Sequence, residues 1–156
     1  MFLDEGSFQD VVASTPLVSI DLVVQNSEGE ILLGQRLNRP AQGFWFVPGG
    51  RILKNEKLDA AFRRLTLQEL GQIFERRHAR LLGVYEHFYA DSVFAEAGLG
   101  PDTHYVTLGY QLILPEQQVL EPPRNQHEHY SWWPMRDMQG SGEVHNNSRA
   151  YLDALH

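Results

Sequence analysis

Apolar residues recur at helical spacing in the middle of the chain, directly after a glycine-rich stretch. The segment 58–71 carries apolar side chains three or four residues apart, at Leu58, Ala61, Phe62, Leu65 and Leu70. This period predicts an amphipathic helix, and Gly71 is placed to end it as a C-cap. The preceding run 45–48 is apolar and aromatic, so we expect a short buried strand that Gly49 and Gly50 break. The pattern predicts a strand, a glycine turn and a helix.

Further apolar runs on both sides of this unit are typical of strands. We expect strands at 17–25, 30–35, 80–89, 105–114 and 132–133. The sequence Asn-Ser-Glu-Gly at 26–29 is a turn signal, so the first two strands should form a hairpin. The segments 90–102 and 121–125 are rich in loop residues.

Both ends of the chain show short helical patterns. Phe8, Val11 and Val12 share one face of a helix that ends at 14–16. A final helix is expected over about 147–155, with Asn146 or Asn147 as its N-cap. Strands therefore dominate around one central helix and two terminal helices. This order predicts the α+β class, as a mixed α/β/α sandwich with a mixed sheet.

Composition and charge exclude several kinds of function. The 156 residues, 42% of them hydrophobic, predict a single domain over 1–156 with one core. The net charge of −7 argues against a nucleic-acid partner, and the absence of cysteine removes disulfides, thiolate metal sites and a cysteine nucleophile. Neither a signal peptide nor a membrane-spanning run is visible, so we expect a cytoplasmic protein without a membrane partner.

The glycine turn and the following helix suggest ligand chemistry. Backbone without a Cβ can approach an anion or a cation closely. Helical spacing places Glu69 beside Leu65 and away from the main solvent side. One carboxylate at the mouth of a glycine turn suits one hard cation and a phosphorylated ligand.

The residues of this unit resemble a known signature. Gly50, Glu56, Arg64, Glu69 and Gly71 stand at the spacing of the Nudix box, the loop–helix motif of nucleoside-diphosphate-X hydrolases, and the resemblance implies the Nudix fold. Two carboxylate positions of that box hold other residues here, namely Leu65 and Gln68. We therefore expect fewer bound ions than in other members, and a catalytic base from elsewhere in the chain.

The departures resemble one subfamily, the GDP-mannose mannosyl hydrolases. The likeness extends through the stretches 14–19, 38–43, 46–51, 103–105 and 146–151. It implies hydrolysis of GDP-mannose, or GDP-glucose as an alternative, to GDP and the free sugar by water attack at the anomeric carbon with inversion. It also implies a homodimer and a setting in nucleotide-sugar supply for polysaccharide synthesis.

The resemblance implies a metal set and a base. One Mg²⁺ ion per site, with Mn²⁺ as a substitute, would bind the backbone oxygen of Gly49, the Glu69 carboxylate and the Gln126 amide. His127 would be the general base, because imidazole titrates near neutral pH. By itself, a histidine in a polar loop is more often a surface residue. Arg64 would orient the metal-binding carboxylate from behind.

Other residues gain roles from the resemblance. Asp21 lies in an apolar strand, where function and a solvated face are about equally compatible with the pattern; the resemblance makes it part of the substrate site. Arg36 would act on the leaving group and Arg51 on the diphosphate, although isolated arginines are usually solvated charges. Tyr105 would lie near the leaving group or be a packed aromatic residue.

The N-terminal segment has two interpretations. Phe2, Leu3 and Phe8 form an apolar stripe that packs on its own domain, or they reach a guanine pocket across a dimer interface, as the resemblance implies. His87, His104 and His129 are candidates without assigned roles.

Two other functions remain open at the level of the sequence. One is a Nudix pyrophosphohydrolase that releases GMP and mannose 1-phosphate. The other is a nucleotide-sugar-binding module without turnover.

Overall fold

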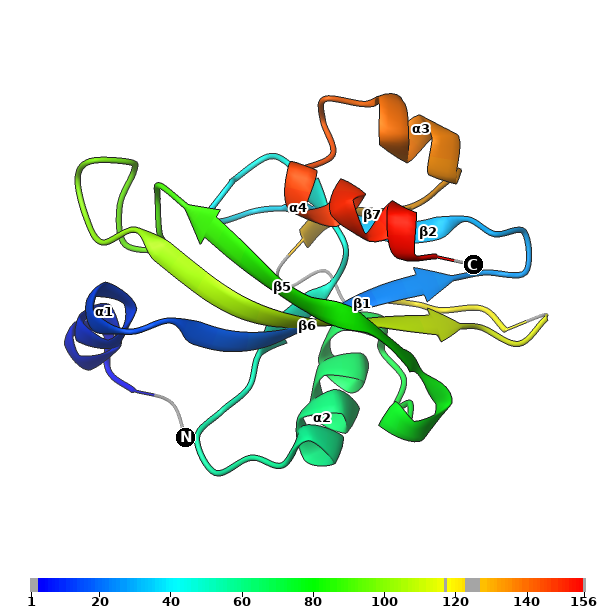
Figure 1. The fold of residues 1–156 in the computed structure, drawn as a ribbon, viewed down its shortest axis with the longest axis horizontal. Coiled ribbons are helices and arrows are strands. Elements are labelled where there is room, and N and C mark those ends of the chain that lie inside the picture. Colours follow the sequence, from blue (N-terminus) through cyan, green and yellow to red (C-terminus); the bar gives the residue numbers. More distant parts are fainter. Residues whose placement is uncertain (1–2, 117, 123–126, 156) are drawn as a thin grey trace.

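A mixed sheet with helices on both faces forms the protein, as the apolar pattern predicts (Figure 1). The computed structural model describes residues 3–116, 118–122 and 127–155, the side chains of residues 127 and 128 excepted. The elements in chain order are α1 (Glu5–Ser14), β1 (Leu17–Gln25), β2 (Ile31–Arg36), β3 (Trp45–Phe46), β4 (Gly49–Arg51), α2 (Leu58–Leu70), η1 (Arg76–His78), β5 (Arg80–Tyr89), β6 (Thr103–Ile113), β7 (His127–Trp133), α3 (Met135–Gly140), α4 (Asn146–Arg149) and η2 (Ala150–Ala154).

Strand β1 is the centre of the sheet. The strands of the sheet lie in the order β3-β2-β1-β6-β5. In addition, β4 pairs with β1, and β7 pairs with β2. The β1–β6 pairing is parallel, and the pairs that β1 forms with β2 and β4 are antiparallel. The sheet is therefore mixed, which confirms the predicted fold class.

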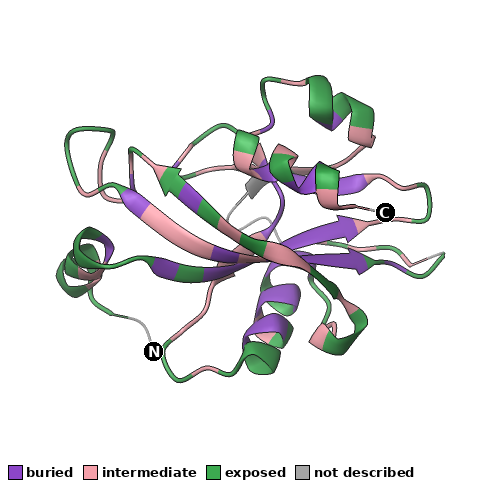
Figure 2. Cartoon of the chain, viewed as in Figure 1, coloured by how far each residue is buried: buried purple, intermediate pink, exposed green. Residues whose placement is uncertain are grey.

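The alternation of side chains along β1 feeds two hydrophobic cores. Ile20, Leu22 and Val24 point to the face covered by α2, where Phe62 is fully buried. Val23 points to the opposite face, which the C-terminal segment covers with its apolar residues, Met138, Val144, Tyr151 and Leu152. Figure 2 shows the buried residues concentrated along the central strands and the inner side of α2. Because both faces are covered, β1 is almost continuously apolar.

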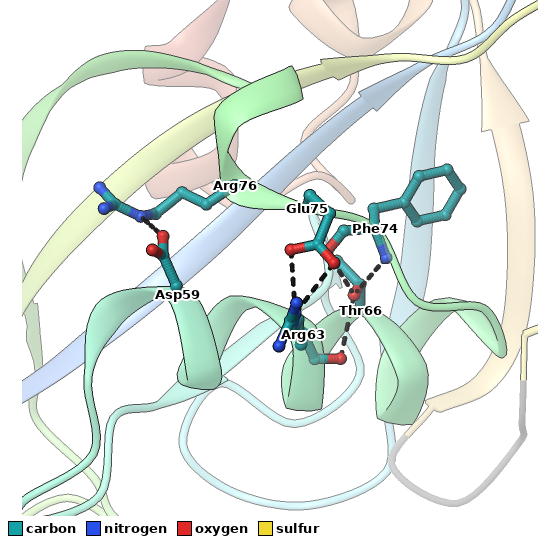
Figure 3. A network of polar contacts seen from close by, with 6 residues as sticks. All are labelled: Asp59, Arg63, Thr66, Phe74, Glu75 and Arg76. Atoms are coloured by element: carbon teal, nitrogen blue, oxygen red, sulfur yellow. Dashed lines mark hydrogen bonds and ion pairs between the residues drawn. The ribbon is translucent and has the colours of Figure 1, made fainter.

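Helix α2 has the predicted bounds and end. Gly71 adopts φ 78° and its N–H donates to the carbonyl of Leu67, which confirms the predicted C-cap. Figure 3 shows the polar contacts that tie α2 to the segment after it. Arg63 donates to Glu75 at 2.9 Å, and Arg76 reaches back to Asp59 at 2.6 Å. These ion pairs are at the surface, so each adds little stability. Together they connect α2 to the segment that follows it.

The sequence predicted a glycine turn at Gly49 and Gly50, and this prediction is wrong. Gly49–Arg51 forms strand β4, which pairs antiparallel with β1. A Cβ at position 49 would lie 2.3 Å from the carbonyl oxygen of Ile20. Glycine thus permits a close strand pairing here rather than a reversal of the chain.

Several element bounds at the C-terminal end also differ from the prediction. Strand β7 begins at His127, whose backbone pairs with Arg36, so this residue lies at a strand end and not in a loop. The final helix is a short α4 followed by the 3-10 helix η2, with α3 as an unpredicted helix before it. The N-cap is His145, and not Asn146 or Asn147, because its ring nitrogen supplies the acceptor. Within the described residues, none of the helices is both long and apolar enough to cross a membrane.

Replacing Phe62 with alanine tests whether α2 anchors the core. Phe62 is fully buried and packs edge-on against Tyr110 with ring centroids 5.4 Å apart. We expect Phe62→Ala to lower the free energy of unfolding by about 3–5 kcal/mol, measured by urea denaturation. Leu67→Ala on the exposed side of the same helix is the control and should change it by less than about 0.5 kcal/mol. Equal losses in both variants would contradict this packing.

Candidate active site

A cavity of about 340 Å³ opens beside β4. Residues that the sequence singled out line it together with others, and those are Phe8, Asp21, Arg36, Gly49, Arg51 and Tyr105. They come from α1 and from four strands, so only the fold brings them together. Leu3 is 44% exposed, and Phe2 and Gln126 lie outside the described residues, as does the His127 side chain.

Asp21 lies in the wall of this cavity, half-way along the apolar strand β1. Its side chain is 20% exposed, and its Oδ2 accepts a hydrogen bond from the Tyr151 hydroxyl at 2.7 Å. His87 Nδ1 lies 4.0 Å from the same oxygen. Burial raises the pKa of Asp21 to about 7, although the Tyr151 hydroxyl and the Arg36 charge oppose the rise. Asp21 is therefore a half-buried carboxylate aimed at the cavity side of the sheet.

Arg36 and Arg51 bring positive charge to the cavity. The Arg51 guanidinium lies 4.2 Å from the centre of the Phe8 ring, a cation–π contact that couples α1 to β4. Arg36 donates from Nε to the carbonyl of Asn38 at 3.3 Å. Among the described residues, neither arginine forms a salt bridge with a carboxylate. Two such guanidinium groups suit an anionic diphosphate.

Tyr105 faces the same cavity from β6. Its ring lies edge-on to Tyr89, with centroids 6.3 Å apart, and burial raises the pKa of its hydroxyl. The structure shows a packed aromatic ring that also lines the cavity, and its predicted place near the leaving group stays a prediction. Its hydroxyl is a neutral donor at physiological pH.

Gly49 and Glu69 lie together at the start of β4. The Gly49 N–H donates to Glu69 Oε1 at 3.4 Å, and Glu69 is only 1% exposed. Within the described residues, no three carboxylate, histidine or cysteine side chains gather as a metal cluster. The buried Glu69 carboxylate is a hard oxygen ligand of the kind that fits Mg²⁺.

Arg64 holds the loop between β4 and α2. Its guanidinium binds Glu56 through two hydrogen bonds, at 2.7 and 2.9 Å, and the carbonyl of Arg51 at 2.8 Å. A further bond at 3.1 Å goes to Gln68. These contacts position the loop and Arg51, and the predicted role of Arg64 in orienting the metal-binding carboxylate stays a prediction. The Arg64 hydrogen bonds hold the pKa of Glu56 below its usual value.

The sequence of this chain matches a known family over almost its whole length. The model of the NUDIX domain matches residues 15–155. The chain belongs to the Nudix family of hydrolases. The two altered positions of the Nudix helix have structural roles, since Leu65 is 2% exposed in the core and Gln68 bonds to Arg64.

Individual Nudix proteins are similar to this chain in sequence and fold. The low-salt glycan biosynthesis protein Agl8 of Haloferax volcanii is 39% identical over 135 residues, which cover 78% of this chain and 81% of that protein. The MutT NUDIX hydrolase of Burkholderia pseudomallei is 28% identical, with a TM-score of 0.68 over 92% of this chain and 100% of that one. The NUDIX domain of Shewanella oneidensis NrtR, solved with ADP ribose, is 19% identical, with a TM-score of 0.67 over 97% and 96%.

The histidines without assigned roles have different positions in this Nudix fold. His87 is 6% exposed and lines the cavity, and burial lowers its pKa to about 4. His104 stacks on Phe88 with ring centroids 4.3 Å apart, on the α2 face of the sheet and away from the cavity. His129 is exposed on β7.

Tyr151 and His145 contact side chains of the cavity wall, and the sequence pattern did not assign a role to either. Both belong to the C-terminal segment, for which the sequence indicated a final helix and, over 146–151, the similarity to the subfamily. His145 stacks on Phe46, which lines the cavity, at 4.6 Å between ring centroids. Its Nδ1 accepts the N–H of Asn147 at 3.1 Å and so begins α4.

The His145 cap predicts a dependence of stability on pH. Burial lowers the pKa of His145 from its ordinary 6.5, and the nearby charge of Arg149 lowers it further. The unfolded chain therefore binds more protons in mild acid, so the cap stabilises the fold above the ordinary pKa and loses this effect as the pH falls through the folded pKa. We expect His145→Asn, which keeps a capping acceptor, to lose less unfolding free energy than the wild type between about pH 7.5 and about pH 5.

Chemical denaturation across this pH range measures the difference. His78→Asn in the exposed η1 is the matched control, and its pH profile should follow that of the wild type. A profile of His145→Asn that is parallel to the wild type would show that the neutral ring of His145 does not act as the cap.

Proposed function

We propose that this chain hydrolyses GDP-mannose, with GDP-glucose as an alternative substrate, to GDP and the free sugar. Water would attack the anomeric carbon and invert its configuration. The observation that carries this proposal is the convergence of Asp21, Arg36, Arg51 and Tyr105 on one cavity beside the Nudix loop. A carboxylate, two cations and a neutral hydroxyl match what a sugar diphosphate presents.

The arginines act on the leaving group. As the bond between the anomeric carbon and the diphosphate oxygen breaks, negative charge grows on the departing GDP. Arg36 and Arg51 hold positive charge at fixed places in the same cavity and stabilise that change. Diphosphate needs no strong general acid once its charge is neutralised, and Tyr105 can donate a hydrogen bond to it.

A divalent ion belongs to this site in the proposal, as is typical of Nudix hydrolases. One Mg²⁺, with Mn²⁺ as a substitute, would be held by the Gly49 carbonyl, Glu69 and Gln126. When bound, it supplies Lewis-acid neutralisation of the diphosphate charge.

The base comes from outside the Nudix helix. We assign His127 to remove a proton from water, on the subfamily resemblance and on its backbone position opposite Arg36. Asp21 holds the sugar or assists the base from the cavity wall. The positive charge that develops on an oxocarbenium-like sugar favours a carboxylate nearby.

The Nudix helix itself argues against attack at phosphorus. Leu65 lies in the core, and a Cβ at Gly50 would be 2.5 Å from its Cδ2, so this position is filled by packing. Gln68 bonds to Arg64 and adds no charge. The helix thus carries fewer carboxylates for metal binding and water activation than attack on phosphorus requires.

The relatives support a role in sugar metabolism. Agl8 is named for glycan biosynthesis, and its identity to this chain extends over most of both proteins. We further propose a homodimer in which the N-terminal residues Phe2 and Leu3 help to form the guanine pocket of the partner. The exposure of Leu3 in the single chain is compatible with this contact.

Isotope labelling decides the bond that breaks. The protein is incubated with GDP-mannose and Mg²⁺ in ¹⁸O-labelled water, and mass spectrometry identifies which product carries the label. We expect label in mannose and unlabelled GDP. Label in GMP or mannose 1-phosphate would mean a pyrophosphohydrolase, and unchanged substrate after long incubation would mean a binding module.

Removing one cation tests the charge argument. Arg51→Gln replaces the guanidinium with a shorter, neutral amide and so removes the charge, and we expect kcat for GDP release to fall by about 100-fold. The exposed Arg77→Gln removes the same charge away from the cavity and should stay within about twofold, because a solvated charge at that distance is screened. Equal rates for both variants would rule out a role for Arg51 on the leaving group.

A further inference from the structure

Tyr151 connects the C-terminal segment to the cavity through one hydrogen bond. Its side chain is fully buried, and its hydroxyl donates to Asp21 Oδ2 at 2.7 Å. A hydrogen bond from a neutral hydroxyl to a carboxylate is stronger than one between neutral groups. Nothing in the pattern of the sequence assigns a role to this residue.

The ring of Tyr151 is held in a notch of the sheet. A Cβ at Gly109 would lie 2.4 Å from its Cε1, so glycine in β6 is what makes room for the ring. Tyr85 packs edge-on against it with centroids 4.6 Å apart. With contacts on both sides, the ring has one position, and its hydroxyl is fixed in space.

The segment before Tyr151 is docked to the end of the cavity wall. The Val47 N–H donates to Ser148 Oγ at 3.0 Å, and Val47 lines the cavity next to β4. The His145 cap begins the same short helix. These contacts fix the position of the Tyr151 hydroxyl relative to the strands that carry the site.

The carboxylate of Asp21 has different surroundings at its two oxygens. Oδ2 receives the tyrosine hydroxyl, while Oδ1 lies against Gly49, since a Cβ there would be 2.6 Å from it. His87 Nδ1, at 4.0 Å from Oδ2, is beyond hydrogen-bond distance. Among the described residues, Tyr151 makes the hydrogen bond that sets how the carboxyl plane is turned.

We propose that Tyr151 is the positioning residue for Asp21 and fixes the orientation of this carboxylate in the cavity wall. The proposal deepens the function proposed above and rests on it for the reaction that Asp21 serves. Removing the hydroxyl frees the carboxylate to rotate about its side-chain torsions, so Asp21 spends less time in the productive orientation. The ring contributes packing, and the hydroxyl contributes the orientation.

Tyr151→Phe separates these two contributions. We expect kcat for GDP-mannose hydrolysis to fall by about 10- to 100-fold, the effect of losing one hydrogen bond to a charged group, with KM within about twofold. Tyr85→Phe removes a hydroxyl from the ring packed against Tyr151 and is the matched control. It should leave kcat unchanged. An unchanged kcat in Tyr151→Phe would overturn the proposal.

A double-mutant cycle tests whether Tyr151 acts through Asp21. In an Asp21→Asn background, Tyr151→Phe should cause no further loss of kcat. Effects that multiply would mean that the tyrosine acts on the substrate or on the fold by another route, and would overturn the assignment.

An NMR measurement that needs no turnover tests the positioning role of Tyr151 separately from the proposed reaction. The carboxyl ¹³C resonance of Asp21, assigned by its loss in Asp21→Asn, is recorded for the wild type in H₂O and in D₂O. We expect an isotope shift transmitted from the exchangeable tyrosine hydroxyl, which Tyr151→Phe abolishes and Tyr85→Phe retains. A wild-type carbon without a shift would overturn the positioning role, whereas a shift in a protein that leaves GDP-mannose intact would overturn only the function.

Discussion

The close pairing of β4 with β1 is the constraint on which the site depends. A side chain at position 49 would collide with the backbone of Ile20 and with Asp21, so only glycine allows the two strands to approach. This approach sets the Gly49 N–H against Glu69 and places Arg51 across from Ser19. The contact between Gly49 and Glu69 and the wall of the cavity are therefore built from one strand pairing.

The charges of the cavity are held by contacts that do not neutralise them. Arg51 lies on an aromatic ring and Arg36 on a backbone carbonyl, while Asp21 takes a hydrogen bond from a tyrosine. Each of these contacts orients its group without forming an ion pair. Burial, and not the contact with the tyrosine, raises the pKa of Asp21. A site arranged in this way keeps its capacity to bind and stabilise a charged ligand.

The Nudix helix keeps its fold although two carboxylate positions of the motif hold other residues. Leu65 gives the core a well-packed apolar side chain, and Gln68 retains a hydrogen bond to Arg64. Arg64 in turn fastens the loop that presents Arg51. Loss of carboxylates from the helix is thus compatible with an intact scaffold, and the charged side chains that line the cavity, Asp21, Arg36 and Arg51, come from strands of the sheet.

The sequence by itself determined the elements that local periodicity controls. The bounds of α2, its glycine C-cap, the long strands β1 and β5 and the first helix all follow from spacing between near neighbours. The family was also predicted from the spacing of the Nudix box, and the family model confirms it. The resemblance to the subfamily singled out Asp21, Arg36, Arg51 and Tyr105, which the fold brings to one cavity, and the roles it implies for them stay predictions.

Only the tertiary structure decided the features that join distant segments. The pairing of Gly49–Arg51 with β1, the start of β7 at His127 and the histidine cap of α4 depend on partners that local patterns do not contain. The bond from Tyr151 to Asp21 spans 130 residues and needs the notch at Gly109. Periodicity reports which face of an element is buried, whereas the identity of the neighbour on that face is settled only when the sheet and its covering helices pack together.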